Sequence, residues 1–83
     1  MATLESVLQR MRDMSEKDGV PSNVSDMLER AMDELQDEDR EMSVRVNSAL
    51  SILDQISNDP NIKQHTRTEI WNLASKVESL NED

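Results

Sequence analysis

Apolar side chains recur every three to four residues in four separate stretches of this chain, and this periodicity constrains the fold more than any other feature. Spacings of i, i+3, i+4 and i+7 place apolar residues on one face of an α-helix. Such a face must be covered by another element. We therefore predict four amphipathic helices that pack together. The four apolar stripes are Leu4, Val7, Leu8, Met11 and Met14; Val24, Met27, Leu28, Ala31, Met32 and Leu35; Met42, Val46, Ala49, Leu50, Ile52, Leu53 and Ile56; and Thr66, Ile70, Leu73, Ala74, Val77 and Leu80.

The residues at the ends of the first two stretches predict where their helices begin and stop. Thr3 suits the N-cap of the first helix, because its hydroxyl can accept a hydrogen bond from an amide of the first turn. Gly19 ends the first segment, and Pro21 prevents its continuation. Pro21 also suits the first position of the second helix, with Ser22 or Asn23 available as a cap.

The end of the third helix is marked more clearly in the sequence than its start. Residues 37–41 contain no apolar side chain, which predicts a turn, and Asp39 is placed to cap the helix that follows. No Gly or Pro marks this turn, so the competing interpretation is one continuous helix over residues 24–56. At the other end, Asn58 predicts a left-handed residue that terminates the helix, and Pro60 blocks extension.

The composition supports an all-α fold. Phe and Tyr are absent and only one Gly is present, whereas strands favour aromatic residues and hairpin turns need glycine. The apolar positions of the first helical hairpin also match those of the second at an offset of 42 residues, a weak HEAT-like internal repeat. Any two amphipathic hairpins of similar length align in this way. We predict an antiparallel up-and-down four-helix bundle built from two hairpins, with residues 1–83 as a single domain.

The charge balance restricts the class of partner. Eighteen acidic residues against nine basic ones give a net charge of −9, which argues against direct binding of nucleic acid or of an anionic membrane surface. The field of such a chain attracts a basic protein. The lack of cysteine excludes a thiol nucleophile and fits a reducing cytoplasm, and the charged N-terminal stretch is not a signal peptide. We expect a cytoplasmic protein.

The polar residues do not form a recognisable catalytic or metal-binding motif. A calcium loop beginning at Asp37 needs Gly at its sixth position and Glu at its twelfth, but Met42 and Ser48 stand there. His65 is the only histidine, which leaves a transition-metal site short of ligands. We expect no bound cofactor and no enzymatic activity. Arg67 is placed to pin the turn before the fourth helix by binding Asp54 or Asp59.

Trp71 is the only aromatic residue and lies off the apolar stripe of its helix. It points about 120° away from the centre of that stripe. Such a tryptophan either covers the edge of the core or anchors an interface, where tryptophan is enriched. Val44 also lies on the outer side of its helix, and we group the two as one candidate surface.

One segment resembles a known family. The sequence from Ala49 to Asn61, which contains Ser-Ile-Leu-Asp and Asn-Asp-Pro-Asn, is followed by His65-Thr66-Arg67-Thr68 and by Ile70-Trp71-Asn72. This combination is similar to the signature of a small archaeal family known only as an uncharacterised protein family. The resemblance implies a compact four-helix bundle in an archaeal cytoplasm and implies no activity.

These observations favour a non-enzymatic protein-interaction module, an adaptor or complex subunit, with a basic protein as its partner. The residues expected to bind the partner are Trp71, Val44, Arg67, His65 and Asp59. The alternative is a small metal-dependent or acid/base factor built on Asp54, Asp59, His65 and Arg67. A homodimer that buries Trp71 and Val44 is a further possibility.

Overall fold

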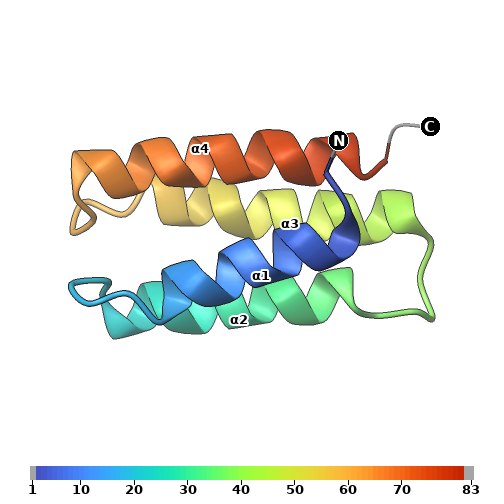
Figure 1. The fold of residues 1–83 in the computed structure, drawn as a ribbon, viewed down its shortest axis with the longest axis horizontal. Helices are drawn as coiled ribbons and strands as arrows, with labels where there is room; N and C mark the ends of the chain where they lie inside the picture. Colours follow the sequence, from blue (N-terminus) through green and yellow to red (C-terminus); the bar gives the residue numbers. More distant parts are fainter. Residues whose placement is uncertain (1, 82–83) are drawn as a thin grey trace.

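The computed structural model describes residues 2–81, which form four helices and no strand. The helices are α1 (Leu4–Ser15), α2 (Ser22–Leu35), α3 (Met42–Ser57) and α4 (Gln64–Ser79). They run up and down in an elongated bundle of 34 × 22 × 20 Å, and both ends of the chain lie at the same end of it (Figure 1). The predicted antiparallel four-helix bundle is confirmed, and the break over 36–41 rules out a continuous helix from 24 to 56.

Each helix packs against two neighbours in a closed ring. α2 packs most extensively on α3, whereas the contact that closes the ring, between α1 and α4, is the smallest. The buried core comes from the predicted stripes together with Ile62 of the last connection. The fully buried large side chains are Val7, Met11, Val24, Leu28, Leu35, Val46, Leu53, Ile56, Ile70, Leu73 and Val77. None of the helices described has the length and apolar run that crossing a bilayer requires.

The first helix begins as the sequence predicts. The hydroxyl of Thr3 accepts a hydrogen bond from the backbone amide of Ser6 at 3.1 Å, and the Ser6 side chain accepts one from the Thr3 amide at 3.0 Å. This reciprocal cap satisfies two amides that the helix itself leaves free. The helix ends at Ser15, and Gly19 lies within the following connection at φ +88°, a left-handed conformation that favours glycine.

Three predicted helix ends are wrong in detail. Pro21 precedes α2 instead of opening it, and no side chain caps the helix; the Pro21 carbonyl accepts from Val24 and Ser25. Asp39 does not cap α3: the helix begins after Glu41, two residues further on, and the Asp39 amide closes a turn by donating to the Asp37 carboxylate.

The predicted left-handed Asn58 is the third correction. Asn58 is right-handed, at φ −91° and ψ 0°, and among the described residues only Gly19 has a positive φ. The last carbonyls of α3 accept bonds from the backbone amides of Asn58 and Asp59, and the Ser57 carbonyl accepts one from the guanidinium of Arg67 in α4. A side chain from the next helix thus does what a left-handed residue does elsewhere, since either one satisfies carbonyls at the helix end.

The two hairpins are also tied together at the end of the bundle opposite the termini. Lys17, in the first connection, forms an ion pair of 3.2 Å with Glu69 of α4. Asn23 of α2 donates a 2.9 Å hydrogen bond to the Asp59 carboxylate in the last connection.

At the 42-residue offset, Ser15 falls on Ser57 and Ser22 on Gln64, so the ends of α1 and α3 and the starts of α2 and α4 correspond.

Candidate functional site

A shallow groove of about 260 Å³ lies between α3 and α4. Its floor is apolar and its lining carries two carboxylates and a tryptophan. The groove arises because the apolar stripe of α3 is broad, whereas α3 packs only on α2 and α4. Part of the stripe therefore stays uncovered at Leu50, which is only partly buried. Ala74, on the facing side of α4, is also only partly buried. The lining residues are Leu50, Leu53, Asp54, Ser57, Ile70, Trp71, Ala74 and Glu78.

Trp71 is the most exposed large apolar side chain in the described chain. It is 55% exposed, and it borders the groove beside buried Ile70. An indole left this far in water gains little from the core, which makes it a candidate anchor for a partner. The same groove contains Asp54, which the sequence analysis had assigned to the alternative metal or acid/base site.

Val44 does not line this groove. It is 44% exposed and lies six residues before Leu50 on α3. Six residues correspond to about 120° around a helix, so Val44 faces away from the side that Leu50 presents. The structure therefore separates the two apolar side chains that the sequence analysis had grouped.

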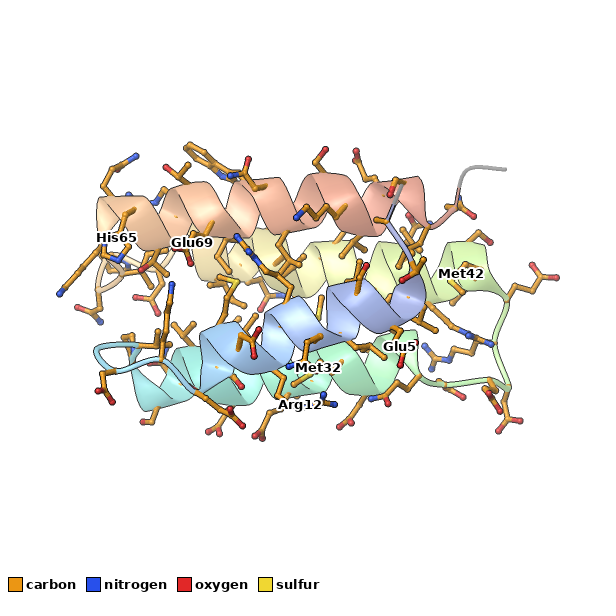
Figure 2. The ribbon with its side chains drawn as sticks, in the orientation of Figure 1. Glu5, Arg12, Met32, Met42, His65 and Glu69 are labelled. Carbon is orange, nitrogen blue, oxygen red and sulfur yellow. The ribbon has the colours of Figure 1, made fainter. Side chains whose placement is uncertain are left out.

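Arg67 holds the connection between α3 and α4. Its Nε donates to the carbonyl of Ser57 at 2.8 Å, and its Nη2 donates to the carbonyl of Asp59 at 3.3 Å. Its Nη1 donates to the Gln64 side chain at 3.1 Å. Figure 2 shows this start of α4 at the labelled His65. The prediction that Arg67 pins this turn is right, but it binds backbone carbonyls, not the carboxylates of Asp54 or Asp59. The planar guanidinium suits this fork of acceptors.

We expect Arg67→Lys to destabilise the bundle by about 1–2 kcal/mol, because a single ammonium group cannot reproduce the fork and so loses at least one hydrogen bond from a charged donor. Urea unfolding followed by circular dichroism measures the change. Arg10→Lys, at an exposed position of α1, is the control. Equal stability of the two variants would contradict the assigned role.

Asp59 is the other polar centre of this connection. Its Oδ1 accepts from the backbone amide of Asn61 at 2.8 Å and its Oδ2 from the Asn23 side chain at 2.9 Å. The bond from Asn61, and secondly that from Asn23, hold the pKa of Asp59 below its ordinary value of 3.8. Both bonds favour the ionised form. Asp59 therefore works as a structural acceptor that joins α2 to the α3–α4 connection.

The lowered pKa gives Asp59 a pH-dependent contribution to stability. Since the folded state holds the proton less tightly than the unfolded state, the contribution is present above the unfolded pKa and is lost as the pH falls through the folded pKa. We expect the parent chain to be more stable than Asp59→Asn at pH 6, and this difference to shrink as the pH falls below the ordinary pKa of 3.8. Thermal melts across that range test it, with Asp26→Asn as control; a difference that grows in acid would contradict the assignment.

The four residues of the alternative site do not converge. Asp54 lines the α3–α4 groove, Asp59 is bound by Asn23 and Asn61, and Arg67 is bound to carbonyls. His65 is exposed in the first turn of α4, at the end of the bundle (Figure 2). Within residues 2–81, no group of three or more His, Asp or Glu side chains is placed to hold a metal ion.

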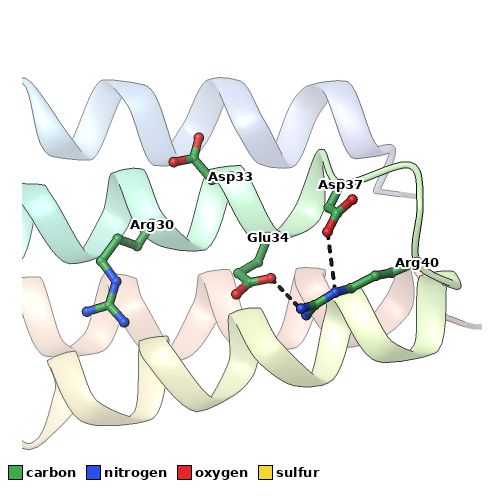
Figure 3. Close-up of a pocket in the computed structure, with 5 residues that line it drawn as sticks. All are labelled: Arg30, Asp33, Glu34, Asp37 and Arg40. Carbon is green, nitrogen blue, oxygen red and sulfur yellow. Dashed lines mark hydrogen bonds and ion pairs between the residues drawn. The ribbon is translucent and has the colours of Figure 1, made fainter.

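A second, charged cleft of about 380 Å³ lies where α2 enters its connection to α3. Arg40 binds two carboxylates there, Glu34 and Asp37, each at 3.3 Å (Figure 3). Arg30 and Asp33 complete the lining. The sequence predicts a turn over residues 37–41 but not the ion pairs that Arg40 forms there. These ion pairs are largely exposed, so they order the connection without adding much stability.

The fold and groove define a small acidic four-helix bundle with a partly uncovered apolar seam. The chain belongs to the uncharacterised protein family UPF0147, whose model matches residues 1–80. It is 39% identical over 80 residues to a UPF0147 protein of Methanothermobacter thermautotrophicus, an alignment covering 96% of this chain and 78% of that one. The resemblance to an uncharacterised archaeal family is thus confirmed.

Two crystal structures share the fold. One is that of MMP1188, described as a protein of unknown function, with a TM-score of 0.88 and 34% identity over 95% of this chain and 90% of that chain. The other is a UPF0147 protein from Thermoplasma acidophilum, with a TM-score of 0.86 and 31% identity over 93% and 91% of the two chains. The bundle is therefore shared with a crystallised member of the same family.

Proposed function

We propose that this chain is a non-enzymatic interaction module that binds a basic protein in the cytoplasm through the groove between α3 and α4. The observation that carries the proposal is the exposed Trp71 beside an apolar floor that the bundle leaves uncovered. An aromatic anchor next to a partly desolvated pocket is the usual centre of a protein interface. Asp54 and Glu78 add negative charge to the same groove.

The size of the groove favours side chains of a protein over a small-molecule ligand. Pockets for small ligands enclose about 300–1,000 Å³ and surround most of the ligand. This groove is smaller, at about 260 Å³, and is open along the helices. It suits one or two apolar side chains of a partner.

The remaining residues predicted to bind the partner have distinct parts in this proposal. Arg67 and Asp59 act indirectly, by fixing the connection from which α4 starts. His65 is exposed near that connection and extends the surface at its end. Val44 lies outside the groove and contributes only where the partner reaches around α3.

The proposal is tested by filling the groove. Ala74→Gln places a longer side chain on the groove floor without changing the net charge, while Ser75→Gln makes the same addition one residue further along, at an exposed position. The immobilised parent chain and both variants are used to capture proteins from an extract of the native cells. We expect a partner that is retained by the parent and by Ser75→Gln and lost with Ala74→Gln. Identical retention by both variants would overturn the proposal.

The alternative function, a metal-dependent or acid/base factor, makes a separate prediction. It requires the side chains of Asp54, Asp59, His65 and Arg67 to act together, whereas the Asp59 carboxylate is bound by Asn23 and Asn61 and the Arg67 guanidinium by backbone carbonyls. Elemental analysis of protein purified without chelators tests its metal-dependent form. Metal bound near one ion per chain, and lost on replacing His65, would favour this alternative over the interaction module.

A further inference from the structure

The charges of the α3–α4 groove define the kind of partner segment that fits it. The lining contains two carboxylates, Asp54 on α3 and Glu78 on α4, and no cationic side chain. Both are exposed, as is Trp71. The apolar floor between them is formed by Leu50, Leu53, Ile70 and Ala74. The groove is thus apolar along its middle and negatively charged on each of its two helices.

The order of the groove residues along α4 gives the approximate spacing of the two carboxylates. The 2.8 Å bond from the Arg67 side chain to the Ser57 carbonyl ties the end of α3 to the first turn of α4. Because α3 and α4 are antiparallel, Asp54, about one turn before Ser57, lies near the following turn of α4, and it lines the groove together with Ile70 and Trp71. Glu78 lies eight residues beyond Ile70, which is about 12 Å at 1.5 Å per residue. Two turns of another helix have nearly the same length.

We propose that the groove binds an amphipathic helix of a partner protein that carries two basic residues seven positions apart with two apolar residues between them. In such a helix, positions i, i+3, i+4 and i+7 share one face. The outer basic pair reaches Asp54 and Glu78, and the inner apolar pair covers Leu50 and Ala74. The cation bound at Asp54 lies beside the indole of Trp71, whose ring attracts cations.

Charge complementarity favours this occupant over a second copy of the chain. Two copies facing each other here would oppose four carboxylates, and each chain carries a net charge of −9. A basic helix instead neutralises both groove carboxylates and is steered toward the acidic surface. This inference rests on the proposed function, because it specifies the chemistry of the partner at the same groove.

A synthetic peptide tests the inference directly. The probe is an alanine-based helical peptide without aromatic residues that contains the pattern Lys-x-x-Leu-Leu-x-x-Lys. One control peptide has Glu in place of both lysines, and another has the same composition with the lysines moved to the opposite face. Trp71 is the only aromatic residue of the chain, so its fluorescence reports on the groove alone. We expect saturable binding of the patterned peptide and at least tenfold weaker binding of both controls.

Matched charge variants separate the groove from general electrostatic attraction. Asp54→Asn combined with Glu78→Gln removes the groove carboxylates, and Asp26→Asn combined with Glu29→Gln removes two exposed carboxylates of α2, which does not contact α4. The net charge changes equally in both. We expect the groove variant to weaken binding by about five- to thirtyfold and the α2 variant by less than about twofold. Equal losses would overturn the inference.

The remaining outcomes distinguish this inference from the proposed function. Equal binding of all three peptides, or none by any, would show the inference to be wrong, while a native partner lost with Ala74→Gln would still support the interaction module. A concentration-dependent dimer of the chain alone, abolished by Ala74→Gln, would identify a second copy as the occupant and contradict the basic helix. If Ala74→Gln retains every native partner, the proposed function itself fails.

Discussion

Replacing Leu28 by alanine is expected to destabilise the bundle by about 2–5 kcal/mol, the largest effect of any single substitution considered for stability. Leu28 is 1% exposed and lies on α2, which packs against both α1 and α3. Truncation leaves a cavity between helices that are fixed by their other contacts and cannot fully close it. A chain of this length has only about 4–12 kcal/mol of total stability, so the loss is a large share of it.

Thermal unfolding followed by circular dichroism measures this effect. For a domain of this size, we expect the melting temperature to fall by roughly 10 °C or more. Leu8→Ala is the matched control, because Leu8 is only partly buried and should cost less. A fall no greater than that of the control would contradict the assignment of Leu28 to the centre of the core.

Replacing Trp71 by alanine is expected to weaken binding of the partner by about 2 kcal/mol or more, roughly thirtyfold in Kd, while leaving the bundle folded. The two effects separate because Trp71 is exposed in the free chain and contributes little to the core, yet becomes buried when the groove is covered. Truncation therefore reduces the apolar area that is buried in the complex, whereas it changes the buried core of the free bundle little.

The control for Trp71 is Val44→Ala, which truncates the other exposed large apolar side chain. Titration calorimetry with the captured partner gives both affinities, and a melt of each variant confirms folding. We expect Val44→Ala to change Kd by less than about threefold, since contacts at an interface rim contribute little. A large loss with Val44→Ala and none with Trp71→Ala would move the binding surface away from the groove.

The helices and core follow from sequence because they depend on local periodicity. The stripe that contains Val24, Leu28 and Leu35 can bury itself in only one way, as one face of a helix. The errors fall where a distant residue intervenes. Asn58 stays right-handed, and the Ser57 carbonyl accepts a bond from Arg67, ten residues further along the chain. A local pattern contains no information on such a partner.

The sequence identified only some of the residues that line the groove, for a related reason. Trp71 stands out because it lies off its helical stripe, and this signal identified it. Leu50 and Ala74 lie on the stripes and look like core residues, whereas the structure leaves them partly uncovered. Which part of a stripe stays exposed depends on how far apart α3 and α4 pack, and periodicity does not determine that distance.

The central claim is that a partner protein docks in the groove between α3 and α4, and photo-crosslinking tests it most directly. A diazirine analogue of leucine is placed at position 50, in the groove floor, or at position 8, a partly buried leucine of α1 that does not line the groove. We expect one discrete crosslinked protein from position 50 and none from position 8. The same crosslinked protein from both positions, or from position 8 alone, would contradict it.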